Sequence, residues 1–87
     1  MNQFIIVGRI DSIEFKDFIC ELTLKVRKSF KKKGHEFDVI LISVQVPNNL
    51  SDTLKEYCKP NDVIGVKGII QENNVLMVEK ITFIDSN

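Results

Sequence analysis

The chain has 87 residues, of which 44% are hydrophobic and 28% charged, and its 12 Lys and Arg are balanced by 12 Asp and Glu. This size and composition fit one small globular domain over residues 1–87, and the zero net charge argues against a strongly cationic nucleic-acid binder. The charge is nevertheless uneven, because residues 1–36 carry eight Lys or Arg against five Asp or Glu, whereas residues 37–87 carry four against seven. The excess of positive charge in residues 1–36 therefore permits a local positive surface patch.

The two cysteines, Cys20 and Cys58, are too few for a disulfide scaffold, and nothing else indicates an oxidising compartment. The opening residues contain no charged leader and no cleavage site, and no apolar run approaches the ~20 residues that a membrane helix needs. We therefore expect a cytoplasmic protein with free thiols and no membrane association.

The first strand is predicted over residues 3–10, a run rich in β-branched and aromatic side chains. This run is apolar on both faces, which predicts burial on both, by the core and by a partner subunit. Gly8 interrupts the run and indicates a bulge or bend. Residues 11–17 are expected to form a polar connection.

The second strand is predicted over residues 18–28 and has the cleanest alternation in the chain. Thr23, Lys25 and Arg27 share one face, because successive side chains of a strand point to opposite sides. The other face is apolar and is expected to point into the core, with Cys20 as an inert buried thiol. The core-facing residues are Phe18, Cys20, Leu22, Leu24 and Val26.

A third strand is predicted over residues 36–46, where a nearly continuous aliphatic run ends at Pro47. Helical spacing then begins and predicts one short helix of about ten residues, capped by Asn49 or Ser51 and stopped at Lys59–Pro60. Tyr57 is expected to pack this helix against the sheet.

Two further strands are predicted, over residues 62–70 and 75–84, with a tight turn at residues 72–74. Gly65 and Gly68 in the fourth strand suit strong coiling at a barrel corner. Three strands, one helix and two strands predict an all-β protein, because closing five strands into a barrel removes exposed strand edges. We therefore expect the five-stranded oligonucleotide/oligosaccharide-binding fold (OB-fold), with a short helix between strands three and four.

A basic run joins the second and third strands. Six cationic side chains and no acidic one occur between Lys25 and Lys33, with Phe30 inside the run and Phe37 at the start of the next strand. Cations that follow phosphates and rings that stack on bases are what a single-stranded nucleic-acid groove needs. The alternative is a solvated hairpin turn with both rings in the core.

Nothing in the sequence indicates catalysis, a metal site or a cofactor. His35 and the two cysteines lack zinc-ligand spacing, and the carboxylates are scattered without an acid–base pair. We therefore expect that the protein is not an enzyme, that it binds no metal, and that it uses no cofactor.

Three pieces of the chain carry a family resemblance through their order and spacing: N-Q-F-I-I-V-G-R-I, then L-T-L-K-V-R-K-S-F-K-K-K-G-H-E-F, then L-S-D-T-L-K-E-Y-C-K-P-N-D-V-I-G-V-K-G-I-I. With them, residues 2–83 resemble the bacterial and phage single-stranded-DNA-binding protein family. The resemblance implies sequence-independent binding of single-stranded DNA, or of RNA, in DNA replication, recombination or repair. It also implies self-association into a dimer or tetramer through the first strand.

The resemblance also implies residue roles. The stacking aromatics of the family fall on Phe30 and Phe37, and its backbone-contacting cations fall on Arg9, Lys25, Arg27 and Lys28, with Lys31, Lys32 and Lys33 nearby.

Three departures from the family weaken the expected binding. Ser43 stands where the family often has an aromatic residue, the turn between the last two strands is short, and the acidic C-terminal tail that recruits other proteins is absent. The zero net charge, the short turn and Ser43 favour an alternative function, that of a protein-interaction subunit such as a primosome-type or mobile-element replication accessory protein, whose partners are replication proteins. A third possibility is another ligand of the same fold, such as structured RNA or an oligosaccharide.

Overall fold

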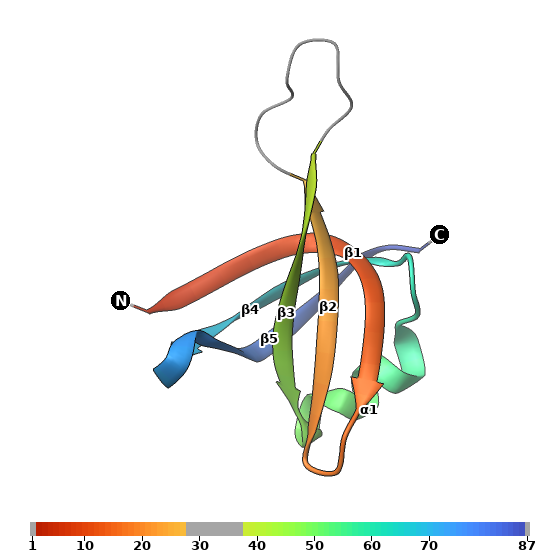
Figure 1. Cartoon of the computed structure of the whole chain (residues 1–87). Helices are drawn as coiled ribbons and strands as arrows, with labels where there is room; N and C mark the ends of the chain where they lie inside the picture. The colour runs from red at the N-terminus through yellow and green to blue at the C-terminus, as the bar shows by residue number, and fades with distance from the viewer. Residues whose placement is uncertain (1, 28–37, 87) are drawn as a thin grey trace.

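The structure is a computed structural model that describes residues 2–27 and 38–86. Five strands close into a barrel in the order β1-β2-β3-β5-β4 (Figure 1). The elements are β1 (Gln3–Phe15), β2 (Ile19–Arg27), β3 (Val39–Pro47), α1 (Asn48–Tyr57), β4 (Val63–Gln71), the 3-10 turn η1 (Glu72–Asn74) and β5 (Val75–Asp85). This arrangement confirms the OB-fold class and the position of the helix between the third and fourth strands.

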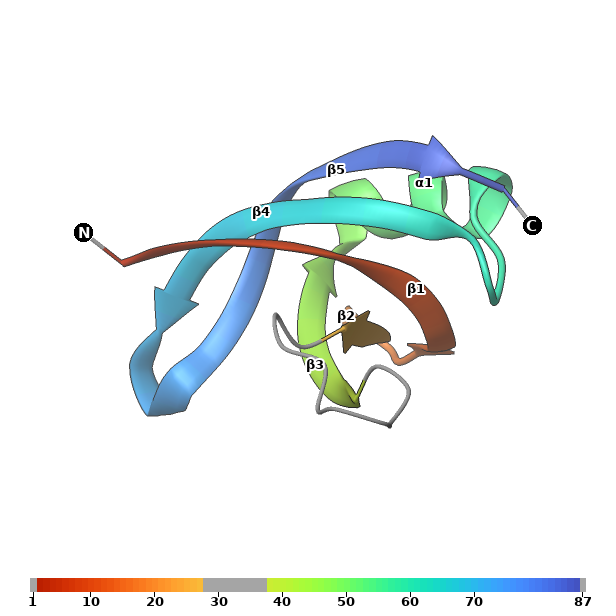
Figure 2. The same ribbon diagram turned by 90° about the horizontal axis from the view of Figure 1, so that it is seen from above.

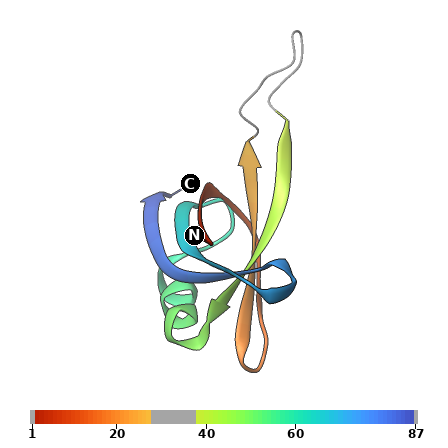
Figure 3. The same ribbon diagram turned by 90° about the vertical axis from the view of Figure 1, so that its left-hand side faces the viewer.

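The barrel closes through one parallel contact between β3 and β5, where Gln45 is in register with Met77. The other neighbouring strands pair antiparallel. The β2–β3 hairpin stands upright and rises beyond the point where β1, β4 and β5 pass (Figures 1 and 3). Seen from above, β1, β4 and β5 form a curved layer, and α1 lies under β5 (Figure 2). Among the described residues, no helix is long and apolar enough to cross a membrane.

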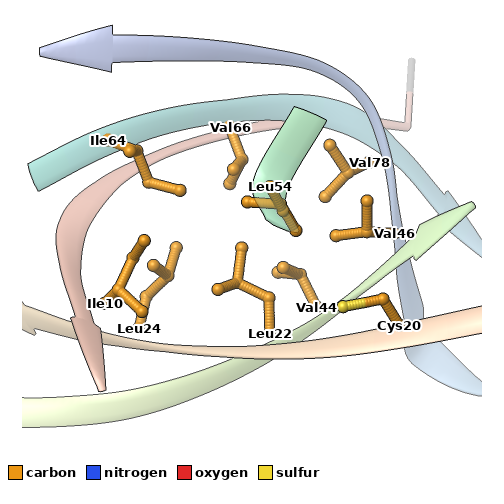
Figure 4. Close-up of a cluster of buried hydrophobic side chains, with 10 residues drawn as sticks. All are labelled: Ile10, Cys20, Leu22, Leu24, Val44, Val46, Leu54, Ile64, Val66 and Val78. Atoms are coloured by element: carbon orange, nitrogen blue, oxygen red, sulfur yellow. The ribbon is translucent and has the colours of Figure 1, made fainter. Parts of the chain in front are cut away.

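The core is formed by alternate residues of the strands and by one helical side chain. Leu54 of α1 is fully buried and lies among the strand side chains (Figure 4). Alternation at period two places Leu22 and Leu24 in the core and leaves their sequence neighbours on the outer face. The buried apolar residues are Ile10, Cys20, Leu22, Leu24, Val44, Val46, Leu54, Ile64, Val66 and Val78.

The first strand is longer than the sequence predicted, because residues 11–15 continue β1 instead of forming a polar connection. The pairing of β1 with β2 shifts between Ile10 and Ser12, so that Asp11 is the extra residue of a β-bulge. A bulge bends a strand without ending its ladder. The pairing therefore resumes at Ser12, opposite Thr23.

The prediction that Phe18 belongs to the core is wrong, because its side chain is 84% exposed. A backbone hydrogen bond from the Lys16 amide to the Ile19 carbonyl closes a turn over this segment. Phe18 is thus a turn residue, and the alternation that buries Cys20 begins only at Ile19.

The expected helix cap is also wrong. Pro47 occupies the N-cap position without a side-chain cap hydrogen bond, and the helix begins at Asn48. Ser51 is already inside the helix, where its hydroxyl donates to the Asn48 carbonyl at 3.0 Å. Tyr57, expected to pack against the sheet, is mostly exposed at the end of the helix.

Two glycines permit the strands to approach closely. The bulge expected at Gly8 lies at Asp11 instead, and a Cβ at Gly8 would meet the Lys25 carbonyl oxygen of β2 at 2.6 Å. Gly68 is buried beside a register shift between β4 and β5, and a Cβ there would collide with the backbone of Met77. Gly68 therefore allows the tight coiling by which the barrel closes.

Candidate nucleic-acid interface

The candidate interface is the outer face of β1, β2 and β3. Thr23 and Ser43 are opposite each other on β2 and β3, and their hydroxyls lie 3.2 Å apart, so the two side chains share a face. This face points away from the core, because Leu22 and Leu24 on either side of Thr23 are buried. Because strand side chains alternate, the residues two and four positions further along share this face. The next rows are Lys25 opposite Leu41 and Arg27 opposite Val39.

The structure brings three of the sequence-predicted cations together on this face. Arg9 of β1 is in register with Lys25 of β2, and Arg27 follows two residues later on the same strand. All three line one surface pocket of about 340 Å³, together with Val7, Gly8 and Val63. Closely spaced cations raise the local positive potential, although the net charge of the chain is zero.

Arg9 is held in place by the turn that precedes β4. One of its terminal nitrogens donates to the Asn61 carbonyl at 2.8 Å. The backbone of this turn is tied to β1, because the Asn61 amide donates to the Ile10 carbonyl and the Ile10 amide donates to the Asp62 carbonyl, both at 2.8 Å. A guanidinium has five N–H donors, so this bond orients Arg9 and leaves further donors for an anionic ligand.

Lys25 has an acidic neighbour that the sequence pattern did not predict. Its ammonium lies 3.5 Å from Asp11 Oδ1, with both side chains partly exposed. The bulge at Asp11 explains this contact, because a bulge redirects the side chain of the extra residue. An exposed pair of this kind contributes roughly 0–1 kcal/mol, so a phosphate can replace the carboxylate at little cost.

The remaining predicted contact residues lie outside the described residues. They are Lys28, Phe30, Lys31, Lys32, Lys33 and Phe37. Of the nine residues predicted to contact nucleic acid, the structure therefore locates Arg9, Lys25 and Arg27 on one surface.

Two exposed aliphatic side chains on the same face were missed in the sequence. Leu41 is 60% exposed and Val39 is about half exposed, although both lie within β3. The third-strand run V-I-L-I is apolar at every position, which hid the fact that alternate members face outward. The alternation of the second strand could have revealed the outward-facing residues of the third, because residues opposite each other on paired strands share a face.

Other features of the described residues offer less for this chemistry. A larger pocket of about 510 Å³ at the β4–β5 hairpin is lined by Glu72 and has no cation. Burial raises the pKa of the Cys20 thiol, and burial together with Asp62 raises that of Cys58, so both thiols stay protonated at neutral pH. Within the described ranges, no three His, Cys, Asp or Glu side chains gather to hold a metal ion.

No family model and no curated protein sequence matches the chain. Several solved structures, however, match its fold. A mitochondrial single-stranded DNA binding protein of S. cerevisiae, Rim1, matches with a TM-score of 0.70 at 19% identity, covering 98% of this chain and 95% of that one. The N-terminal domain of the PriB protein from Thermoanaerobacter tencongensis, described as dimeric, matches with a TM-score of 0.70 at 14% identity, covering 98% of both chains.

A small single-stranded DNA-binding protein from Streptomyces coelicolor matches with a TM-score of 0.72 at 14% identity, covering 97% of this chain and 95% of that one. At these identities the matches show a shared fold over nearly the whole chain. The fold implied by the family resemblance is thereby confirmed.

Proposed function

We propose that the protein binds single-stranded DNA without regard to sequence and acts in DNA replication, recombination or repair. The observation that carries this proposal is the convergence of Arg9, Lys25 and Arg27 in one pocket on the outer face of the barrel. Two of the structural neighbours named above are single-stranded DNA-binding proteins, which favours this function over that of an accessory protein without DNA binding.

The physical basis is counterion release. Each phosphate neutralised on a single strand contributes about −0.7 to the slope of log K against log salt, so three cations alone would give a slope of about −2. Neither charge neutralisation nor stacking distinguishes one base from another, because every base has a π-face. Binding should therefore be tolerant of sequence.

Phe30 and Phe37 are proposed as stacking residues, and Lys28, Lys31, Lys32 and Lys33 as further phosphate contacts. These assignments rest on the basic, aromatic composition of the segment between β2 and β3 and on the family resemblance. Each stacked ring would contribute roughly 1–3 kcal/mol.

A salt-titrated binding assay tests the proposed function. Fluorescent oligo-dT should bind at ~50 mM salt with a log–log slope of about −2 or steeper. A mixed-sequence single strand should compete about as well as oligo-dT, and a duplex of equal length should compete poorly. No measurable binding at this salt concentration would refute the function and leave the accessory role.

We further propose that two copies associate through the outer face of β1. Ile5 is 72% exposed there, and Val7 and Ile84 are about half exposed beside it. These three side chains line an apolar groove of about 270 Å³. Apolar side chains on the outer face of a strand fit burial by a second subunit, and the PriB domain of the same fold is described as dimeric.

Substituting a charge into this face should prevent association. Ile5→Lys places a cation next to Lys67, its partner on β4, and should convert the protein into a monomer of 10.0 kDa. Light scattering at micromolar concentration measures this, with the wild type expected at two or four times that mass. Ile70→Lys, at the far end of β4, is the matched control. A wild-type mass of about one chain would contradict the proposal.

A further inference from the structure

We propose that Leu41 is a base-packing residue of the interface, so that the bound strand lies with its phosphates over β1 and β2 and its bases over β3. This inference rests on the proposed function and adds to it the orientation of the ligand. It also assigns a role to a residue that neither the sequence pattern nor the family resemblance singled out.

The register of the three strands aligns cations with aliphatic side chains. Arg9, Lys25 and Leu41 are consecutive partners across β1, β2 and β3, and they form one row on the outer face. Arg27 and Val39 form the next row, about 7 Å further along the strands. In both rows the cation lies on β2 and the aliphatic side chain on β3.

This face is asymmetric, with cations on one side and apolar side chains on the other. The pocket that gathers the three cations is lined by residues of β1, β2 and β4 and by none from β3. Beside it, β3 presents Leu41 and Val39, which are apolar and exposed. Polar and apolar contacts are thus divided between the two sides of the surface.

The chemistry of the ligand matches this division. An unpaired polynucleotide is also divided, with charged phosphates along one side and flat, weakly hydrated base faces along the other. Cations bind the first and apolar side chains pack on the second. A second copy of this chain would match less well, because its corresponding face carries the same three cations and like charges would repel.

The position of Leu41 distinguishes it from an ordinary exposed leucine. Single surface leucines are common and need no explanation. Leu41, however, is 60% exposed although it lies within a paired strand, in one row with Arg9 and Lys25. The strand pairing therefore holds the exposed side chain of Leu41 on the same face as the cations.

Two substitutions of Leu41 with opposite expected effects test the proposal. Leu41→Ala should weaken oligo-dT binding by about five- to tenfold, because it removes apolar contact area. Leu41→Phe should strengthen binding by about fivefold or more, because a ring offers a stacking surface. Neither variant should change the salt slope, because neither changes a charge. Ile70→Ala, which removes a 37%-exposed aliphatic side chain away from the cations, should bind like the wild type.

The outcomes separate this inference from the proposed function. If the wild type binds oligo-dT and both Leu41 variants bind equally well, the base-packing role is overturned while the function stands. If Leu41→Ala lowers the mass measured by light scattering instead of the affinity, the face is a contact between copies and the inference also fails. If Leu41→Ala proves unstable by thermal unfolding, Leu41→Phe alone decides, and an affinity at or below the wild-type value overturns the proposal.

Discussion

Gly68→Ala should lower the free energy of unfolding by about 3 kcal/mol or more, which is a large part of the stability of a domain of this size. The added Cβ would collide with the backbone of Met77 and would lie 2.9 Å from the Val78 Cα. A neighbouring side chain could rotate away, but the ladder of β5 would have to move. Since Gly68 also pairs with Phe4 of β1, such a shift would disturb both neighbours of β4. Thermal or urea unfolding followed by circular dichroism measures the effect.

Gly65→Ala is the matched control on the same strand. Its Cβ would lie 3.6 Å from the Ile84 side chain and 3.7 Å from that of Val7, which are ordinary contacts. We expect a change within about 0.5 kcal/mol, as is usual for a substitution that breaks no packing within a subunit. Because Gly65 lines the groove proposed for association, both glycine variants are compared on the Ile5→Lys background. Equal stability of the two variants would show that β4 and β5 do not approach as closely at Gly68 as the structure indicates.

The double substitution Lys25→Glu and Arg27→Glu should weaken oligo-dT binding by about 100-fold or more at ~50 mM salt. Removing two phosphate contacts, each contributing about 0.7 to the salt slope, accounts for roughly 70-fold at this concentration, and the new carboxylates add repulsion. The salt slope should become shallower by about 1.4. Both side chains lie on the outer face, so the fold should persist.

Its control is Lys55→Glu with Lys59→Glu, which changes the net charge by the same amount at the C-terminal end of α1. If binding depends on the cluster, this control should lose only the small long-range contribution of net charge. Similar losses in both double variants would mean that binding follows total charge and not the surface of β1, β2 and β3.

The fold was predictable from sequence because its signals are local. The alternation of β2 identified Leu22 and Leu24 as core, and the change to helical spacing after Pro47 located α1. The errors lie where the ladder departs from regularity. A bulge at Asp11 extends β1 through residues that the sequence predicted as a polar connection, and a turn at residues 16–19 removes Phe18 from the alternation.

The site was predictable only in part. The alternation of β2 predicted that Lys25 and Arg27 share a face, but the position of Arg9 beside them depends on the β1–β2 register, which a sequence pattern does not fix. For the same reason, the sequence did not reveal that Asp11 lies beside Lys25 or that Leu41 lies opposite it. The composition of the basic run indicated nucleic-acid binding, whereas the pairing of the strands determines which residues lie together on the surface.

Amide chemical-shift mapping during titration with oligo-dT tests the interface most directly in a protein of 10.0 kDa. The largest shifts among the described residues should fall on residues 7–9 of β1, 23–27 of β2 and 39–43 of β3, with α1 and the β4–β5 hairpin little changed. Shifts centred on α1 or on that hairpin, with β2 and β3 unaffected, would contradict the assignment of the binding surface.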